Sequence, residues 1–232
     1  MGGKDLKSNE LITLKNPKSV ISEAFRTLRT NIQYSNIDNS IKTILVTSSM
    51  SEEGKTVVAA NLAVSIAYTG KKVLIIDCDL RKPTLHKKLG IYNFKGLTNV
   101  LIGEIAFEEV IDKHNDIPTL DILTSGPIPP NPSELLGSMK MEEFLSNLKN
   151  EYDIIILDSP PVGIVTDAAI LSTKTEGVLL VVNSGKTETD AVKRSKELLE
   201  NVNANIIGVV LNKVDMKNKA YSKYGYSKYY GE

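Results

Sequence analysis

Three stretches of the sequence place phosphate- and metal-binding residue types next to short apolar runs. The first is SSMSEEGKT, residues 48–56, which leads directly into the apolar segment VVAANLAVSIA. In a phosphate-binding loop, backbone N–H groups and a helix N-terminus hold the phosphates, a lysine reaches the β- and γ-phosphates, and a hydroxyl ligates Mg²⁺. Here the lysine is Lys55 and the hydroxyl belongs to Thr56. The predicted nucleotide-binding residues are Ser51, Glu52, Glu53, Gly54, Lys55, Thr56 and Val57.

The other two stretches end in aspartates. In LIIDCDLRKP, Asp77 and Asp79 share one face of an extended segment, and Arg81 follows at the same interval. In DIIILDSPP, Asp158 follows four apolar residues. Such carboxylates favour Mg²⁺ binding and a base for an incoming hydroxyl, whereas the alternative is a set of solvated or turn-forming acids. The predicted metal-binding residues are Thr56, Asp79 and Asp158.

The elements that must position these residues are short β-branched runs alternating with amphipathic stretches. Strands are predicted at Thr43–Thr47, Val73–Asp77, Leu120–Thr124, Asp153–Asp158, Val178–Asn183 and Ile206–Asn212, and helices at Thr56–Tyr68, Met141–Lys149 and Thr187–Asn201. Fully apolar strands separated by helices indicate a parallel sheet covered on both faces. The predicted fold class is α/β, a doubly wound and mainly parallel sheet. Ligands bind at the carboxyl ends of the strands of such sheets, and all three stretches fall there.

Composition excludes several other classes. The 28 basic and 28 acidic residues of the 232-residue chain cancel, which argues against a general nucleic-acid coat. The single Cys78 fits a reducing compartment. Neither a signal-peptide core nor an apolar run long enough to span a bilayer is present in the sequence. We therefore expect a cytoplasmic chain.

The sequence ends YSKYGYSKYYGE, so five of its nine tyrosines fall within residues 221–230. One interpretation is a disordered tail, because chain termini are seldom tied down. A second is nucleic-acid contact, through lysines interleaved with stacking rings. A third is that the hydroxyls are acceptors in a reaction. The tail by itself does not decide between these three interpretations.

In this order along the chain, SSMSEEGKT, LIIDCDLRKP and IIILDSPPV resemble the three nucleotide motifs of bacterial tyrosine kinases, which are P-loop enzymes of capsule and exopolysaccharide production. EAFRTLRTNI resembles the ExxRxxR oligomerisation helix of that family, and GPIPPNPSELL resembles its proline-rich segment. The tail resembles its autophosphorylated tyrosine cluster. Each motif alone is only moderately specific, but the ordered set is highly specific and extends over nearly the whole chain.

The resemblance implies ATP-dependent phosphorylation of tyrosine, largely on neighbouring copies of the same chain, with ATP and Mg²⁺ as cofactors. The implied catalytic residues are Lys55, Asp77, Asp79, Arg81 and Asp158. The implied phosphoacceptors are Tyr221, Tyr224, Tyr226, Tyr229 and Tyr230. Glu23, Arg26 and Arg29 would form the interface of a ring-like homo-oligomer. The alternative for these three residues is an ordinary charged helix face.

The resemblance also implies a domain organisation and partners. Residues 1–36 would form an arm with the oligomerisation helix, 37–215 the nucleotide-binding kinase domain, and 216–232 a flexible tail. Such kinases are activated by the cytoplasmic tail of a transmembrane polysaccharide co-polymerase, here expected as a separate polypeptide. The chain would then be held at the inner face of the membrane. Other tyrosine-phosphorylated proteins are further possible partners, and nucleic acid is not expected.

Other functions stay open at this point. A partner-activated ATPase switch of the septum-positioning or partitioning type shares the fold, but its loop carries a second lysine where this chain has Met50. A GTPase is suggested by the run NKVD that begins at Asn212, although Asp158 lacks the glycine expected after it. Asn212 is instead predicted to line an adenine pocket or to end a strand. A non-enzymatic scaffold would result if Glu52, which replaces a family glycine, disables the loop.

Overall fold

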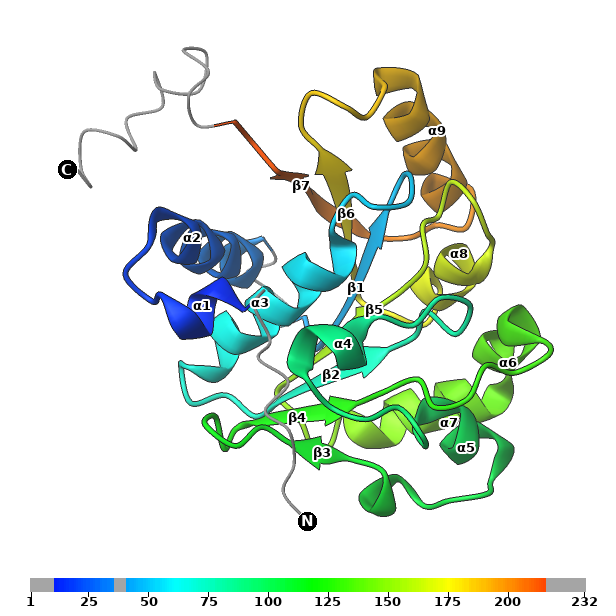
Figure 1. Ribbon diagram of the computed structural model, residues 1–232. Coiled ribbons are helices and arrows are strands. Elements are labelled where there is room, and N and C mark those ends of the chain that lie inside the picture. The colour runs from blue at the N-terminus through cyan, green and yellow to red at the C-terminus, as the bar shows by residue number, and fades with distance from the viewer. Residues whose placement is uncertain (1–10, 36–40, 216–232) are drawn as a thin grey trace.

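The computed structural model describes residues 11–35 and 41–215, which form a seven-stranded sheet with helices on both faces (Figure 1). The strand order is β3-β4-β2-β5-β1-β6-β7. The strands are β1 (Thr43–Ser48), β2 (Val73–Asp77), β3 (Asp112–Lys113), β4 (Leu120–Leu123), β5 (Ile154–Asp158), β6 (Gly177–Asn183) and β7 (Ile206–Asn212). All neighbouring pairs are parallel except β3 and β4, which are antiparallel. The predicted fold class is confirmed, and β3 is an edge strand that was not predicted.

The helices divide between two core clusters, one on each face of the sheet. One face carries α1 (Ile12–Lys15), α2 (Val20–Tyr34), α3 (Lys55–Ala67) and α4 (Leu85–Leu89). The other carries α5 (Leu97–Ile102), α6 (Pro132–Gly137), α7 (Met139–Leu148), α8 (Asp167–Ser172) and α9 (Thr189–Glu200), with a 3₁₀ turn at Phe107–Glu109. The three helices predicted beyond the arm agree with α3, α7 and α9 to within two residues. No helix among the described residues is long and apolar enough to cross a bilayer.

Burial follows from position in the sheet. Every residue of β1 is buried, because β5 and β6 flank it and helices cover both of its faces. Helix α3 is buried along most of its length, and its alanines allow a close approach to the sheet. The edge strand β7 is only half-buried, and Val209 and Leu211 are more than half exposed. The apolar runs of the sequence therefore mark the central strands, as expected for a doubly wound sheet.

The N-terminal arm packs against α3 in the same chain. Ser19 caps α2, because its hydroxyl accepts a hydrogen bond from the N–H of Ser22 at 3.1 Å. On α1, the N–H and hydroxyl of Thr13 both donate to Oδ1 of Asn61, at 3.1 and 2.9 Å. The expected boundary between arm and kinase domain, residues 36–37, and the tail, residues 216–232, lie outside the described residues.

Candidate active site

The phosphate-binding loop joins β1 to α3 and is braced from inside by Glu53. This side chain is 2% exposed, and its Oε2 accepts a hydrogen bond from the N–H of Met50 at 2.7 Å. Its Oε1 accepts from the N–H of Asn183 at 3.3 Å and from the hydroxyl of Thr187. Glu53 thus ties the loop to the end of β6. Glu53 was predicted to bind the nucleotide, and in the structure its carboxylate contacts Met50, Asn183 and Thr187.

The loop is also held from the end of β7. The side-chain amide of Asn212 donates to the carbonyl oxygen of Glu53 at 2.8 Å, and Nζ of Lys213 donates to that of Glu52 at 2.7 Å. Gly54 has φ +92°, and a Cβ there would clash with the Asn212 amide. Only glycine adopts this φ without strain and also leaves room for the Asn212 amide. Asn212 therefore lies against the loop backbone, at the end of its strand.

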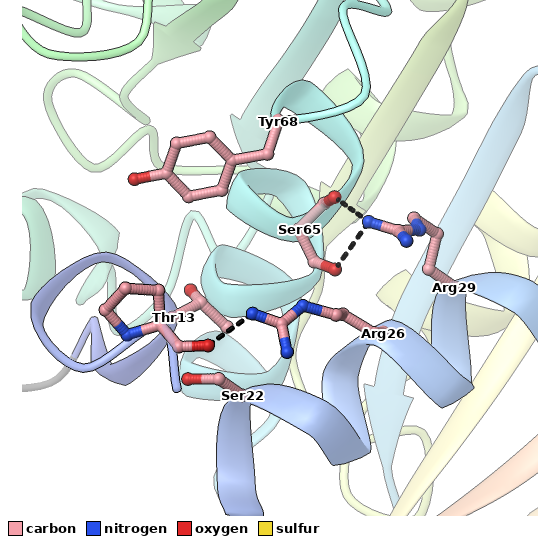
Figure 2. Close-up of a pocket in the computed structure, with 7 residues that line it drawn as sticks. Thr13, Ser22, Arg26, Arg29, Ser65 and Tyr68 are labelled. Carbon is pink, nitrogen blue, oxygen red and sulfur yellow. Dashed lines mark hydrogen bonds between the residues drawn. The ribbon is translucent and has the colours of Figure 1, made fainter. Parts of the chain in front are cut away.

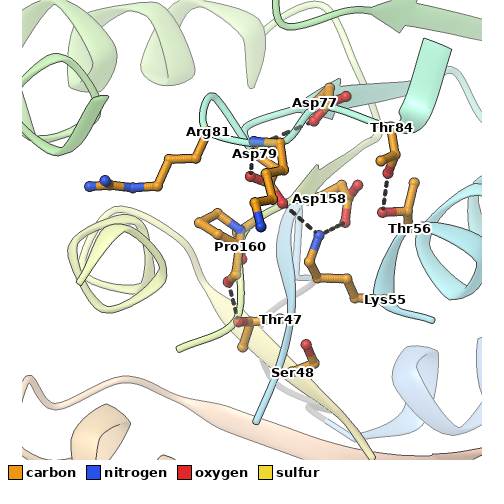
Figure 3. A network of polar contacts seen from close by, with 12 residues as sticks. Thr47, Ser48, Lys55, Thr56, Asp77, Asp79, Arg81, Thr84, Asp158 and Pro160 are labelled. Carbon is orange, nitrogen blue, oxygen red and sulfur yellow. Dashed lines mark hydrogen bonds and ion pairs between the residues drawn. The ribbon is translucent and has the colours of Figure 1, made fainter. Parts of the chain in front are cut away.

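The aspartates meet because of the sheet register. Asp77 and Asp158 are paired residues of the neighbouring strands β2 and β5. Nζ of Lys55 lies 2.9 Å from Oδ2 of Asp79 and 3.8 Å from Oδ1 of Asp158 (Figure 3). The exposed fractions of Asp77, Asp79 and Asp158 are 0%, 4% and 0%. The alternative of solvated acids is therefore wrong, because all three carboxylates are buried around one lysine.

Asp77 also organises the segment after β2. Its Oδ1 accepts a hydrogen bond from the N–H of Asp79, and its Oδ2 accepts from the N–H of Leu85, both at 3.1 Å. The preceding Thr84 was not singled out from the sequence, yet its hydroxyl lies 3.1 Å from that of Thr56. A threonine after a proline carries no signal of this contact, which depends on how α4 folds back over α3.

Burial and mutual charge set the protonation properties of the cluster. Burial raises the pKa of Asp77 well above its ordinary value, and the charge of Asp158 adds to this. Burial also raises the pKa of Asp158, although the charge of Lys55 and the nearby Thr56 hydroxyl oppose the shift. Burial alone would lower the pKa of Lys55, but the charges of Asp158 and Asp79 outweigh it, so that pKa is raised. Three buried carboxylates and one ammonium group thus form a site that favours additional positive charge.

Cys78 lies between Asp77 and Asp79 in the chain and is fully buried. Burial raises the pKa of its thiol well above the ordinary value, and the neighbouring aspartates raise it further. The thiol therefore stays protonated, which makes it a poor nucleophile.

The side chain of Arg81 points away from Lys55 (Figure 3) and pairs with a different carboxylate. Its Nε and Nη2 each donate to Asp167 of α8 at 2.9 Å, and Nη2 also donates to the hydroxyl of Ser133 at 2.7 Å. Asp167 is fully buried, so this bidentate pair fastens the segment after Asp79 to α6 and α8. The structure thus brings Lys55, Asp77, Asp79 and Asp158 together, and it places the guanidinium of Arg81 outside that cluster.

The three predicted interface residues lie on α2 and make contacts within the chain. Arg26 forms an ion pair with Glu23 and donates to the carbonyl oxygen of Pro17. Arg29 donates from Nη1 to the carbonyl oxygen of Ser65 at 2.6 Å, in the last turn of α3. Carbonyls in that turn lack helical partners, and a cation there interacts favourably with the helix dipole. The predicted acceptor tyrosines lie outside the described residues.

Comparison with known proteins identifies the family. The AAA domain family model matches residues 41–210. The tyrosine-protein kinase YwqD of Bacillus subtilis is 44% identical over 216 residues, covering 93% of this chain and 90% of YwqD. The chain belongs to the bacterial tyrosine-protein kinase family. The kinase domain of the Escherichia coli tyrosine kinase ETK superimposes with a TM-score of 0.86 at 34% identity, covering 90% of this chain and 82% of that domain.

A third relative differs in length. The tyrosine-protein kinase Wzc of Salmonella typhi is 35% identical over 98% of this chain, yet this chain spans only 32% of Wzc.

The ATPase-switch alternative is the less favoured one. MinD of Aquifex aeolicus, a cell division protein, has a TM-score of 0.64 at 27% identity, covering 80% of this chain and 73% of MinD. The MinD likeness is to the P-loop NTPase fold that the two proteins share, whereas the kinase relatives are closer in sequence and structure. The kinase relatives thus identify this chain as an enzyme, a protein-tyrosine kinase.

Proposed function

We propose that this bacterial tyrosine kinase binds ATP and Mg²⁺ at the loop of residues 48–56 and transfers the γ-phosphoryl group to tyrosines of its own C-terminal tail. The observation that carries the proposal is the position of Lys55. Its ammonium group lies between Asp79 and Asp158 at the N-terminus of α3, where phosphate groups bind favourably. An ammonium group there reaches phosphate oxygens on one side and carboxylates on the other.

The residues around Lys55 fit a magnesium ion. Both carboxylate oxygens of Asp158 are buried and accept no hydrogen bond within the described residues, and the Lys55 ammonium group lies 3.8 Å from Oδ1, beyond hydrogen-bond distance. Buried acceptors of this kind are costly unless a cation or donor satisfies them. Asp158, Asp79 and the Thr56 hydroxyl would hold the ion, with phosphate oxygens and water as its remaining ligands, since Mg²⁺ commonly binds through one or two carboxylates. When bound, the magnesium ion would offset the negative charge of the phosphate oxygens.

The transfer itself depends mainly on positioning and charge. The tyrosine oxygen attacks the γ-phosphorus in line with the bridging oxygen of ADP, whose bond to that phosphorus breaks. A tyrosine hydroxyl has a pKa of about 10, so its proton needs an acceptor. We assign this role to Asp77, because burial raises its pKa and makes its carboxylate a stronger base. The ammonium group of Lys55 stabilises the negative charge that develops on the departing ADP.

The direct test is incubation of the purified chain with ATP and Mg²⁺, followed by site-resolved mass spectrometry. Phosphotyrosine is expected on Tyr221, Tyr224, Tyr226, Tyr229 and Tyr230. ATP hydrolysis without any phosphotyrosine would instead favour the ATPase switch. GTP serves as the matched control nucleotide, and faster transfer from GTP than from ATP would contradict the assignment of ATP as cofactor.

We also propose that the chain assembles into a ring through Glu23, Arg26 and Arg29. Their shared stripe on α2 supports this, because Arg26 is 41% exposed at its side chain and can exchange Glu23 for a carboxylate of the next subunit. Replacing all three with alanine is expected to leave a monomer by multi-angle light scattering. Alanine at Lys193, Arg194 and Glu197, exposed charges of α9, is the control and should leave the mass unchanged. Equal masses for wild type and the α2 variant would contradict the interface.

The biological setting that we propose is the regulation of capsule or exopolysaccharide synthesis and export. We propose that the kinase is switched on by a separate activator. That activator would be the cytoplasmic tail of a transmembrane polysaccharide co-polymerase, which would hold the kinase at the inner face of the membrane. Other proteins that carry phosphotyrosine would be further substrates.

The backbone conformation of Glu52 is expected to lower the stability of the chain. Its φ of +63° is the left-handed conformation, which costs about 1–2 kcal/mol for a residue with a side chain. Glycine avoids that strain but loses about 0.5–1 kcal/mol in chain entropy. Glu52→Gly is therefore expected to stabilise the chain by up to about 1.5 kcal/mol in urea unfolding and to tighten ATP binding by calorimetry.

Glu52→Gln is the control that separates backbone strain from charge. It keeps the side chain and the strain but removes the negative charge near the phosphates. It is expected to tighten ATP binding without changing the free energy of unfolding. If Glu52→Gly were less stable than wild type, the left-handed backbone at position 52 would not be a source of strain.

A further inference from the structure

A cavity of about 330 Å³ lies between the N-terminal arm and the C-terminal end of α3. Its lining combines two arginines, three hydroxyl side chains, a proline and a phenol: Thr13, Pro17, Ser22, Arg26, Arg29, Ser65 and Tyr68. We call it the arm pocket. Helix α3 has 13 residues and is about 20 Å long, and Lys55 is at its other end. The arm pocket is therefore separate from the site where phosphoryl transfer is proposed.

The charge of the arm pocket is positive and only partly balanced. Arg26 is paired with Glu23, but within the described residues Arg29 forms no ion pair with a carboxylate. The Nη1 of Arg29 donates to the carbonyl oxygen and hydroxyl of Ser65, at 2.6 and 3.4 Å. Its Nε and Nη2 have no hydrogen-bond partner in that part of the chain. A guanidinium group held at one nitrogen, with two donors still available, is suited to an anion that accepts two hydrogen bonds.

The walls of the arm pocket select the kind of anion. Figure 2 shows the Arg29 guanidinium extending from α2 toward Ser65 of α3, with the Tyr68 ring on the α3 side. Arg26 reaches the carbonyl oxygen of Pro17, which also lines the pocket. Tyr68 is 52% exposed, which leaves its ring accessible to a ligand. An aromatic ring can pack on a phenol and a proline, and a phosphate fits the guanidinium fork. The combination matches an aryl phosphate better than it matches a free phosphate ion.

We propose that the arm pocket binds a phosphotyrosine of the chain's own C-terminal tail. This rests on the proposed function, because that reaction makes the ligand. The described chain ends at Asp215, and the tail tyrosines follow 6 to 15 residues later. If flexible, these lengths span about 12–15 Å and about 19–23 Å r.m.s., which is comparable with the length of α3. A tail released from one active site therefore has the reach to place a phosphotyrosine at the far end of α3.

The proposal has a consequence for assembly. Arg26 and Arg29 are the residues that we also assign to the ring interface, so a phosphotyrosine in the arm pocket competes with the neighbouring subunit. Phosphorylation would then loosen the ring by occupying one of its contacts, in addition to any repulsion between charged tails.

The test uses the full chain with its five tail tyrosines changed to phenylalanine, so that its own tail cannot supply the ligand. The probe is a fluorescent peptide with the sequence of residues 219–228, phosphorylated on Tyr224, and binding is measured by anisotropy without ATP. It is expected to bind at least about tenfold more tightly than the unphosphorylated peptide. Arg29→Ala is expected to remove this difference, and Arg29→Lys is expected to reduce it, because lysine keeps the charge but loses the fork.

Two further variants separate a binding role from a structural one. Tyr68→Ser removes the aromatic wall at an exposed position and should weaken the phosphopeptide several-fold. Arg194→Ala removes an exposed arginine of α9 and should have no effect. Because the peptides are synthetic, failed binding would refute the arm pocket without bearing on the kinase reaction.

Three results would overturn the proposal. One is equal binding of the two peptides. Another is equal binding of a peptide phosphorylated on Ser222, which would indicate a general phosphate site. The third is displacement of the probe by inorganic phosphate at the concentration at which the phosphopeptide itself competes. In the assembled protein, binding of the phosphopeptide with no fall in mass by light scattering would overturn the competition with the ring.

Discussion

Replacing Lys55 with methionine is expected to lower the rate of phosphotyrosine formation by at least about 10³-fold. The ammonium group lies 2.9 Å from Asp79 and 3.8 Å from Asp158, at the N-terminus of the helix where the phosphates are proposed to bind. Methionine fills a similar volume but supplies no charge for the departing ADP. The measurement is the initial rate of phosphotyrosine formation at saturating ATP and Mg²⁺, quantified by mass spectrometry.

The same substitution also removes the cation from a buried cluster. Breaking a buried ion pair from one side costs about 3–5 kcal/mol, so thermal unfolding must be recorded in parallel. The control is Lys55→Met combined with Asp79→Asn, which removes one of the unpaired charges. This double variant should recover part of the lost stability and none of the activity. Wild-type phosphorylation by either folded variant would refute the role of Lys55.

Asp77→Asn is expected to cause a similar loss, because an amide cannot accept the tyrosine proton. The amide also presents a donor to the N–H group of Leu85 or Asp79, so the melting temperature of this variant is a necessary second measurement. Asp79→Asn is the comparison, since Asp79 is assigned to the metal. A rise in the Mg²⁺ concentration needed for half-maximal rate is expected for Asp79→Asn and not for Asp77→Asn. Full activity of a folded Asp77→Asn chain would exclude this residue as the base.

Changing all five tail tyrosines to phenylalanine is expected to abolish most phosphotyrosine and to keep the oligomer assembled after ATP is added. Each phosphotyrosine adds about −1.5 to −2 charges, so five add roughly −7.5 to −10. The tail carries four lysines, which cannot balance that charge. In the wild type, tails that first bind acidic active sites of neighbouring subunits would then be repelled from them. The measurement is molar mass by light scattering before and after incubation with ATP and Mg²⁺.

A matched control removes tyrosines elsewhere. Tyr34 and Tyr92 are 67% and 69% exposed, so their replacement by phenylalanine tests whether any accessible hydroxyl serves as acceptor. This control should keep phosphorylating its tail and should dissociate as the wild type does. Wild-type stoichiometry in the five-phenylalanine variant would contradict the tail as acceptor. A fully phosphorylated wild type that stays assembled would contradict the link to disassembly.

Much of this architecture was predictable from the sequence, because its signals are local. Central strands of a parallel sheet are buried on both faces, so they read as continuous apolar runs such as Ile154–Leu157. The Gly54-Lys55-Thr56 triplet follows one such strand and opens a helix, which is enough to place a phosphate-binding loop. The spacing of Asp77 and Asp79 and the position of Asp158 put all three at strand ends. Since parallel strands end at a common edge of the sheet, the sequence also predicted that these three aspartates lie close together.

The tertiary structure decided the contacts that join residues far apart in the chain. Asp167, the partner of Arg81, is 86 residues away, and the carbonyl oxygen held by Lys213 is 161 residues away. Neither pairing has a local signal, because each depends on strand order and on how helices pack over the sheet. The two-residue strand β3 is too short to show a pattern. Arg29 was assigned to a neighbouring subunit because EAFRTLRTNI resembles an oligomerisation helix, and only packing against α3 places its guanidinium at Ser65 and beside a cavity. Spacing along the chain determines which face a side chain occupies, whereas packing determines what lies opposite it.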